Sequence, residues 1–148
     1  MPASRFKLSR RVAFSETDAA GIVHFANFFR YMEDAEHAFL RHLGLRVHHD
    51  HEEGTAGFPR VSAACDYLAP LRFEDEFDIE LRVTKKSGKS ITYAFAFTRP
   101  DGNDTVKVAT GQLTVVYVTR PNATTPYRAT QLPGAYDEQI VVDEEKAV

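Results

Sequence analysis

The stretch SETDAAGIVHFAN, residues 15–27, carries the residue types that could do chemistry. It contains an acid, Asp18, then a flexible turn at Ala20 and Gly21, then a short apolar run that leads into a helical pattern. A helix N-terminus presents free backbone N–H groups and the positive end of the helix dipole, so it can hold an anion or a developing oxyanion. A carboxylate beside it can act as nucleophile or as general base for water. We predict this role for Asp18; the alternative is that Asp18 only caps a turn.

Several side chains after Asp18 could take part in the same chemistry. His24 could assist Asp18 or orient water, since its unperturbed pKa of ~6.5 suits proton transfer near neutrality, or it could pack at the helix entry. Phe28 and Phe29 could line an acyl pocket, although both positions also suit the core. Glu33 lies within the helical pattern, either buried near the site or exposed and paired with a neighbour three or four positions away.

A lysine cluster suggests a binding site for phosphate. Lys85, Lys86 and Lys89 surround Ser87 and Gly88 in a hairpin pattern. Lysine is a competent partner for phosphate, so this hairpin could hold the phosphates of a coenzyme, with Lys89 as the best candidate. The alternative is a solvated hairpin tip.

Other reactive residue types do not form a recognisable site. The run HHDHEE, residues 48–53, is contiguous and lies in an expected loop, whereas a metal site needs ligands from rigid elements, so we expect no metal. Cys65 alternates with apolar residues and is expected in the core rather than as a nucleophile. The sequence has neither the Gly-x-Ser-x-Gly pattern of serine hydrolases nor a phosphate-binding glycine loop.

One helix and about five strands must position these residues. Apolar residues recur every three or four positions over residues 27–43, which predicts an amphipathic helix with Asn27 as N-cap and Gly44 just past its end. Residues 45–57 are polar and read as a loop. Alternating apolar residues predict antiparallel strands at residues 5–14, 61–67, 77–83, 91–97 and 106–118. The apolar phase of the last strand slips near Gly111, which indicates a β-bulge there.

These elements favour a single α+β domain over residues 1–148, in which the sheet curls around the helix. The core is expected over about residues 5–120, with an irregular tail from Thr119 onward. Residues 115–118 are apolar on both parities, so something should cover the second face or the edge of this strand, and a partner subunit is one candidate.

Composition excludes several function classes. The 148 residues are 43% hydrophobic and 26% charged, with a net charge of -3, so there is no basic excess for a nucleic acid backbone. We find no apolar run long enough to span a membrane and no signal-peptide core. A single cysteine agrees with a reducing compartment, and we expect the protein in the cytoplasm.

The run from residue 14 to residue 44 resembles the signature of the 4-hydroxybenzoyl-CoA thioesterase family. The matching features are Asp18, then Gly21, an aromatic-rich helix entry over residues 23–27, and an acid in the helix, Glu33. The resemblance covers roughly residues 5–120 and includes the pairs Pro70 and Asp75, and Lys89 and Ser90. Many members of that family carry Tyr-His where this chain has His24 and Phe25, so the histidine is displaced by one residue.

The resemblance implies a hotdog fold, a five-stranded antiparallel sheet wrapped around one long central helix. It also implies a homodimer or homotetramer with active sites at the dimer interface. The family's Asp serves as nucleophile or general base in thioester hydrolysis, which assigns that role to Asp18. The implied oxyanion donor is the backbone N–H of Phe25, with His24 as a possible helper. The implied substrate-binding residues are Gly21, whose turn can approach the thioester closely, and Asn27, Phe28, Glu33, Lys86 and Lys89.

We therefore predict an acyl-CoA thioesterase that converts an aryl- or fatty acyl-CoA to the free acid and CoA. It would need no cofactor, because CoA is part of the substrate. Two alternatives remain open. One is a non-hydrolytic acyl-CoA binding protein in which Asp18 is structural, and the other is a hotdog enoyl-CoA hydratase or dehydratase, which would use a His and Asp pair. The identity of the acyl group, and the choice between CoA and acyl carrier protein, also stay open.

Overall fold

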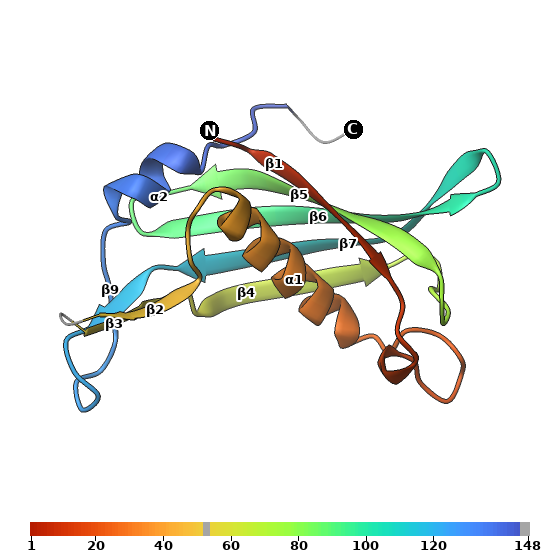
Figure 1. The fold of residues 1–148 in the computed structure, drawn as a ribbon, viewed down its shortest axis with the longest axis horizontal. Coiled ribbons are helices and arrows are strands. Elements are labelled where there is room, and N and C mark those ends of the chain that lie inside the picture. The colour runs from red at the N-terminus through yellow and green to blue at the C-terminus, as the bar shows by residue number, and fades with distance from the viewer. Residues whose placement is uncertain (52–53, 146–148) are drawn as a thin grey trace.

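Five strands form one antiparallel sheet that curves around the long helix α1 (Figure 1). The structure is a computed structural model and describes residues 1–51 and 54–145. Strands follow the order β1-β5-β6-β7-β4 across the sheet. Helix α1 spans Asn27–His42, and the strands are β1 Arg5–Arg11, β4 Arg60–Tyr67, β5 Glu76–Lys86, β6 Ser90–Asp101 and β7 Asp104–Val116. A sheet wrapped around one helix confirms the predicted α+β fold class.

Helix α1 buries one face against the sheet because its apolar residues recur every three or four positions. Its C-terminal end matches the prediction. Gly44 has a φ of +76°, its N–H donates to the Arg41 carbonyl, and the Leu45 N–H donates to the Leu40 carbonyl, which is a Schellman motif. The predicted N-cap is wrong, because Ala26 holds the N-cap position and the helix already begins at Asn27.

The core fills the space between α1 and the concave face of the sheet. Inward-facing residues alternate along the central strands: Phe77, Ile79, Leu81 and Val83 on β5, and Ile91, Tyr93, Phe95 and Phe97 on β6. Each large side chain buried in this way contributes about 1.5–3 kcal/mol relative to an exposed one. Met32 of α1 packs directly over Gly111 of β7, since a Cβ at Gly111 would overlap the Met32 side chain.

A β-bulge is present in β7, but the predicted position near Gly111 is wrong. Gly111 lies in a regular part of the ladder, and the register shifts after Phe97 of β6, where Val108 is the extra residue of β7. The Val108 carbonyl accepts hydrogen bonds from the N–H groups of Leu68, at 2.8 Å, and Ala69, at 3.0 Å. Through these two hydrogen bonds, the bulge holds the chain where β4 ends and the segment of residues 68–72 begins.

A second, smaller sheet lies at one end of the molecule, on the left in Figure 1. It contains β2 His48–His51, β3 Gly54–Gly57, β8 Val118–Arg120 and β9 Arg128–Ala129, in the order β2-β3-β8-β9. The predicted loop over residues 45–57 is therefore wrong for both strands of the β2-β3 hairpin. Burial explains the difference. The Ala56 side chain on β3 is fully buried, and the ring of Phe58, which follows β3, packs 5.3 Å from the ring of Tyr117.

The predicted tail from Thr119 onward is irregular over most of its described residues, but the prediction is wrong at three short elements. The tail forms β8, β9 and a short helix, α2 Gly134–Gln139, whose Tyr136 is buried with its neighbours Leu132 and Ile140. The Tyr136 ring packs 6.1 Å from the ring of Tyr117. The chain itself therefore covers the Tyr117 end of the apolar run of residues 115–118, while Val116 stays half-buried. Within residues 1–51 and 54–145, neither helix has the length and apolar composition to cross a membrane.

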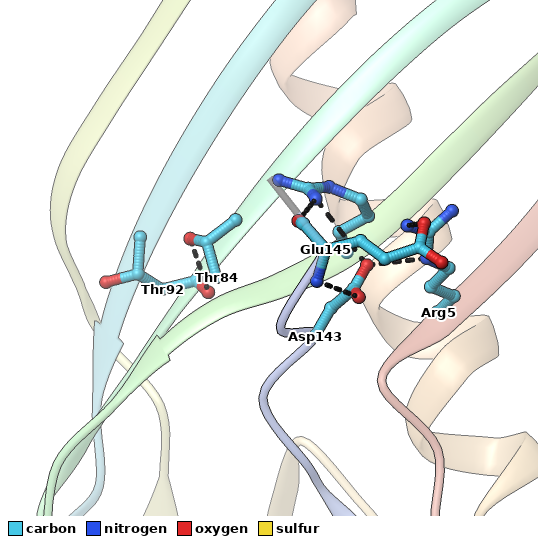
Figure 2. Close-up of polar contacts among 6 residues, drawn as sticks. Arg5, Thr84, Thr92, Asp143 and Glu145 are labelled. Atoms are coloured by element: carbon cyan, nitrogen blue, oxygen red, sulfur yellow. Dashed lines mark hydrogen bonds and ion pairs between the residues drawn. The ribbon is translucent and has the colours of Figure 1, made fainter. Parts of the chain in front are cut away.

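Residues 141–145 tie the end of the described chain to its beginning (Figure 2). The Asp143 carboxylate accepts a hydrogen bond of 2.5 Å from Nε of Arg5, and the Glu145 carboxylate accepts one of 2.6 Å from the same guanidinium. Arg82 of β5 donates to the Glu145 backbone carbonyl at 2.7 Å. Partial desolvation opposes ionisation of Asp143, but the Glu145 backbone N–H and Arg5 outweigh it and hold its pKa below the ordinary value. The C-terminal residues therefore clamp the β1-β5 edge of the sheet.

Candidate active site

An apolar cleft lies between the loop of residues 17–26, the start of α1 and the end of β4. Its volume is about 600 Å³. Its wall is mainly apolar, with two charged residues, Asp18 and Arg72, and the lining residues are Asp18, Ile22, Val23, Phe25, Phe28, Tyr67, Leu68, Ala69, Pro70, Leu71 and Arg72. The cleft thus contains the two groups predicted to be at the reaction centre, the Asp18 carboxylate and the residue Phe25.

Short backbone contacts hold the Asp18 loop in place. The Asp18 N–H donates to the Ile22 carbonyl at 2.9 Å, and the Gly21 N–H donates to the Asp18 carbonyl at 2.9 Å. Gly21 has a φ of +81°, so the turn itself requires a residue that tolerates positive φ. The Val23 N–H donates to the Leu71 carbonyl at 2.8 Å, which fastens the loop to the segment after β4.

Glu16 anchors the same loop from its other side. One carboxylate oxygen accepts hydrogen bonds from the Ala13 N–H and from the buried Tyr31 hydroxyl, at 2.8 and 3.0 Å. The second oxygen is 3.1 Å from the guanidinium of Arg10. The Glu16 backbone carbonyl accepts a hydrogen bond of 2.8 Å from the Asn27 side chain. Asn27 therefore holds the loop against α1, and its predicted contact with substrate stays untested.

Asp18 forms the predicted turn and keeps one carboxylate oxygen free of protein contacts within the described part of the chain. It is exposed, and its Oδ1 accepts a hydrogen bond of 2.8 Å from the Ala20 N–H, which is an Asx turn. Among the described residues, Oδ2 has no hydrogen-bond partner. One oxygen therefore shapes the turn while the other is open to a ligand in the cleft.

The prediction of several free N–H groups at the helix entry is wrong. A tight turn before α1 satisfies them: the Ala26 N–H donates to Nδ1 of His24 at 3.2 Å, and the Asn27 N–H donates to the His24 carbonyl at 2.9 Å. The next two N–H groups, of Phe28 and Phe29, donate to carbonyls three residues earlier. The Phe25 N–H has no acceptor within the described part of the chain, so it is the one backbone donor left open where the loop enters the helix.

His24 lies at the surface beside this donor. Its ring packs 4.6 Å from the Phe25 ring, and its Nδ1 accepts the Ala26 N–H, so the neutral ring carries its proton on Nε2. The histidine therefore caps the helix entry. Its predicted part in proton transfer is not tested by this geometry.

Phe28 serves the core and the cleft together. It is buried, and its ring meets the rings of Phe97 and Tyr67 edge to face, with centroids 5.4 and 5.2 Å apart. The same ring forms part of the cleft wall. Phe29 is half-buried and does not line this cleft.

Glu33 is not part of the cleft in a single chain. It is exposed on α1 and lies 3.1 Å from the guanidinium of Arg60 on β4, rather than pairing along its own helix. It lines a second groove, of about 640 Å³, at the Arg60 end of β4. The wall of this groove also includes His37, Phe58 and Tyr127.

The two predicted phosphate-binding lysines differ in their surroundings. The Lys86 ammonium donates to the backbone carbonyls of Asp137 and Ile140, both at 2.8 Å, and lies 3.0 Å from the Asp137 carboxylate. It therefore closes the C-terminal end of α2. Lys89 is exposed in the β5-β6 turn, at the end of the sheet opposite to the Asp18 cleft.

Neither the histidine run nor Cys65 forms a reactive site in the described structure. No group of three or more His, Cys, Asp or Glu side chains within residues 1–51 and 54–145 is placed to hold a metal ion. The last two residues of HHDHEE lie outside these ranges. Cys65 packs against the core, and burial raises the pKa of its thiol, so a reactive thiolate is disfavoured.

The sequence reasoning did not predict the two polar cleft residues Tyr67 and Arg72 as site residues. In the sequence, Tyr67 continues the alternating apolar pattern of a strand, which predicts a buried side chain. It is exposed because β4 lies at the edge of the sheet. The break Leu-Ala-Pro that follows could have marked Tyr67 as the end of a strand. The backbone N–H of Arg72 donates to the Asp75 carboxylate at 2.8 Å, but its guanidinium forms no ion pair among the described residues, and nothing in its sequence neighbourhood distinguishes it.

One helix wrapped by an antiparallel sheet, with a carboxylate and an open backbone N–H in one apolar cleft, defines the class of hotdog-fold thioesterases. A profile of the thioesterase-like superfamily matches residues 12–140, and the chain belongs to this superfamily. Both the predicted hotdog fold and the predicted family resemblance are confirmed.

Individual relatives agree with this assignment. A putative esterase of Aquifex aeolicus is 36% identical over 96 residues, which cover 65% of this chain and 74% of that protein. A 1,4-dihydroxy-2-naphthoyl-CoA hydrolase of Prochlorococcus marinus is 30% identical over 108 residues, which cover 68% of this chain and 72% of that protein. The solved structure of a 4-hydroxybenzoyl-CoA thioesterase from a Pseudomonas species shares the fold, with a TM-score of 0.77 at 22% identity over 93% of this chain and 99% of that one.

Proposed function

We propose that the protein is an acyl-CoA thioesterase whose reaction takes place in the Asp18 cleft. The observation that carries the proposal is that, within the described residues, one apolar cleft is lined by both Asp18, which has a carboxylate oxygen without a protein partner, and Phe25, which has an N–H without a protein acceptor. Hydrolysis of a thioester needs a base or nucleophile and a donor for the oxyanion, and these two groups supply them. No cofactor is required, since CoA belongs to the substrate.

In the general-base form of the mechanism, the Asp18 carboxylate removes a proton from water as the water oxygen attacks the thioester carbonyl carbon. The carbonyl oxygen becomes an oxyanion that accepts a hydrogen bond from the Phe25 N–H. The C–S bond then breaks, the CoA thiolate leaves and takes up a proton, and the free acid remains. In the nucleophilic form, Asp18 attacks first and water hydrolyses the resulting anhydride. Both forms give the same products.

We propose an aromatic acyl group as the preferred substrate. Three aromatic rings, of Phe25, Phe28 and Tyr67, line the cleft, and aromatic faces and edges pack favourably against a further ring. The Prochlorococcus relative is named as a hydrolase of a naphthoyl-CoA, which is an aromatic thioester. A fatty acyl chain is the competing substrate class.

We propose that two copies pair through β4 and complete each other's site. Strand β4 ends the sheet order, and its Val61 side chain is 61% exposed. Antiparallel pairing of two such edges would place the Tyr67 end of one copy beside the Arg60 end of the other. The Arg60 end also carries the Glu33 groove and the turn with Lys89. In such a dimer, Glu33 and Lys89 of one copy would lie near the Asp18 cleft of the other, so their predicted contacts with substrate require this dimer.

Free-thiol release from a panel of aryl, short, medium and long acyl-CoA esters tests the function. We expect release by the wild type, fastest with aryl esters, and a loss of about 10²- to 10⁴-fold in Asp18→Asn. Asparagine retains the oxygen that accepts the Ala20 N–H, so the turn survives. Asp78→Asn is the matched control, because Asp78 also accepts one short hydrogen bond, from Ser9, but lies outside the cleft.

The outcomes separate the alternatives. Wild-type rates in Asp18→Asn would refute the proposed mechanism. Saturable binding of the esters without any thiol release would favour an acyl-CoA binding protein. A change in enoyl-CoA absorbance without thiol release would favour a hydratase or dehydratase.

A further inference from the structure

The peptide that follows Phe25 is held at both of its ends. Its carbonyl accepts hydrogen bonds from the Tyr67 hydroxyl, at 3.0 Å, and from the Phe28 N–H, at 3.3 Å, and its N–H, which belongs to Ala26, donates to Nδ1 of His24 at 3.2 Å. The peptide before Phe25 has its carbonyl, of His24, bonded to the Asn27 N–H. The open Phe25 N–H therefore belongs to a peptide whose carbonyl is bonded, and the next peptide is bonded at both its carbonyl and its N–H.

Tyr67 is the long-range member of this arrangement. It comes 42 residues after Phe25 in the sequence and is the last residue of β4, whereas His24 belongs to the same loop as Phe25. The Tyr67 ring meets the buried Phe28 ring edge to face, with centroids 5.2 Å apart. The Val108 bulge fixes the chain after Tyr67 through the N–H groups of Leu68 and Ala69. The hydroxyl is thus presented from the rigid sheet to the loop that holds the reaction centre.

The hydroxyl is available as a donor over the whole working range of pH. Burial of the group raises the pKa of Tyr67 to about 12, and the neighbouring Cys65 adds to this effect. A neutral phenol keeps its proton, and that proton is the one directed at the Phe25 carbonyl.

We propose that Tyr67 is a positioning residue for thioester hydrolysis, because its hydroxyl holds the Phe25 segment so that the Phe25 N–H points into the cleft where the oxyanion forms. This inference rests on the proposed function. It adds a residue of the edge strand to a reaction centre whose two proposed groups, the Asp18 carboxylate and the Phe25 N–H, both come from the loop before α1. Tyr67 acts through Phe25 and makes no bond to the reacting atoms.

The expected effect follows from the way an oxyanion donor works. Such a donor stabilises the transition state only when it is already oriented at hydrogen-bonding distance from the oxyanion, and small displacements are costly. Loss of the Tyr67 hydroxyl leaves the donor in place but removes the shorter of the two hydrogen bonds at the carbonyl of the neighbouring peptide, so that only the bond from the Phe28 N–H remains there. The effect should therefore fall on kcat rather than on KM.

Tyr67→Phe is the direct test, since it removes only the hydroxyl and keeps the ring against Phe28. We expect kcat for the best ester of the panel to fall about 10-fold, less than the loss on removing an oxyanion donor, with KM within about 2-fold of the wild type. Tyr136→Phe is the matched control. It also removes a hydroxyl that bonds to the backbone, at 2.7 Å from the Arg46 carbonyl, but outside the cleft, so kcat should not change.

A second readout needs no turnover. Amide ¹⁵N relaxation and hydrogen exchange of Phe25 and Ala26 should show increased motion in Tyr67→Phe and none in Tyr136→Phe. Unchanged amide dynamics, or an unchanged kcat in an active enzyme, would overturn the positioning role. If the wild type releases no thiol, the proposed function fails, while the amide measurements still decide whether Tyr67 restrains the Phe25 segment.

Discussion

The guanidinium of Arg60, on the edge strand β4, forms hydrogen bonds of 2.5 and 3.0 Å with the carboxylate of Glu36, which has no exposed surface on α1. The same guanidinium reaches Glu33 and the Phe58 carbonyl. Burial raises the pKa of Glu36, and the hydrogen bonds from Arg60 offset part of that effect. This pair ties the outermost strand of the sheet to the central helix.

Arg60→Met should therefore destabilise the protein in a pH-dependent way. Removing one partner of a buried ion pair costs about 3–5 kcal/mol, because the remaining charge is left uncompensated. A carboxyl whose folded pKa is raised contributes most stability below its unfolded pKa and loses it as pH rises through the folded value. Urea unfolding should show a larger loss at pH 8 than at pH 5. Equal losses at both values would contradict this, and Arg41→Met, at an exposed position, is the control.

His24 variants distinguish a helix cap from a proton carrier. His24→Asn should keep activity within about 3-fold, because an asparagine oxygen can accept the N–H two residues ahead, as Nδ1 of His24 does for Ala26. His24→Ala removes the acceptor and should lower kcat about 10-fold. Steady-state kinetics on both variants checks this. A large, equal loss in both would instead assign proton transfer to His24.

Lys86 and Lys89 should respond differently to removal of their charge. Lys86→Met should lower the free energy of unfolding by about 1–2 kcal/mol, since charged hydrogen bonds to α2 are lost, and should leave KM for CoA esters unchanged. Lys89→Met should raise KM severalfold at low salt and leave stability unchanged. A rise of KM in Lys86→Met without loss of stability would show that Lys86 leaves α2 to bind substrate.

The edge of β4 should control assembly. Val61→Lys places a charge at an exposed apolar position of that edge, which is a common device against strand pairing. We expect the dimer dissociation constant to increase at least 10-fold, with the monomer still folded, as measured by analytical ultracentrifugation and circular dichroism. Thr105→Lys, on the exposed β6-β7 hairpin, is the control. An unchanged dimer would place the interface elsewhere.

Local patterns in the sequence predicted the central elements correctly. The spacing of apolar residues in α1 and the glycine at position 44 depend on neighbours within one or two turns, so they are visible in the sequence. The β2-β3 hairpin was missed because its polar composition resembles a loop and its partner strand, β8, lies about sixty residues later. The slip in apolar phase between Val108 and Leu113 predicts a bulge near Gly111, but the extra residue is Val108, and Gly111 makes room for Met32.

The candidate site was predictable to a similar extent. Asp18, Gly21 and Phe25 lie within one short loop, and their turn chemistry is local. Tyr67 meets Phe25 only through the folded sheet, and Lys86 meets α2 across more than fifty residues, so neither contact has a sequence signal. Long-range polar contacts of this kind depend on packing that no local pattern records.

The contact between Arg5 and Asp143 has a consequence for synthesis of the chain on the ribosome. These residues are 138 positions apart, so at about 5–20 residues per second Asp143 is added roughly 7–30 s after Arg5. Strand β1 also waits for β5, with which it pairs from Arg5 to Arg11. During translation the first strand therefore emerges long before its partner strand exists, and the contacts that clamp the β1-β5 edge can form only after Asp143 has been added.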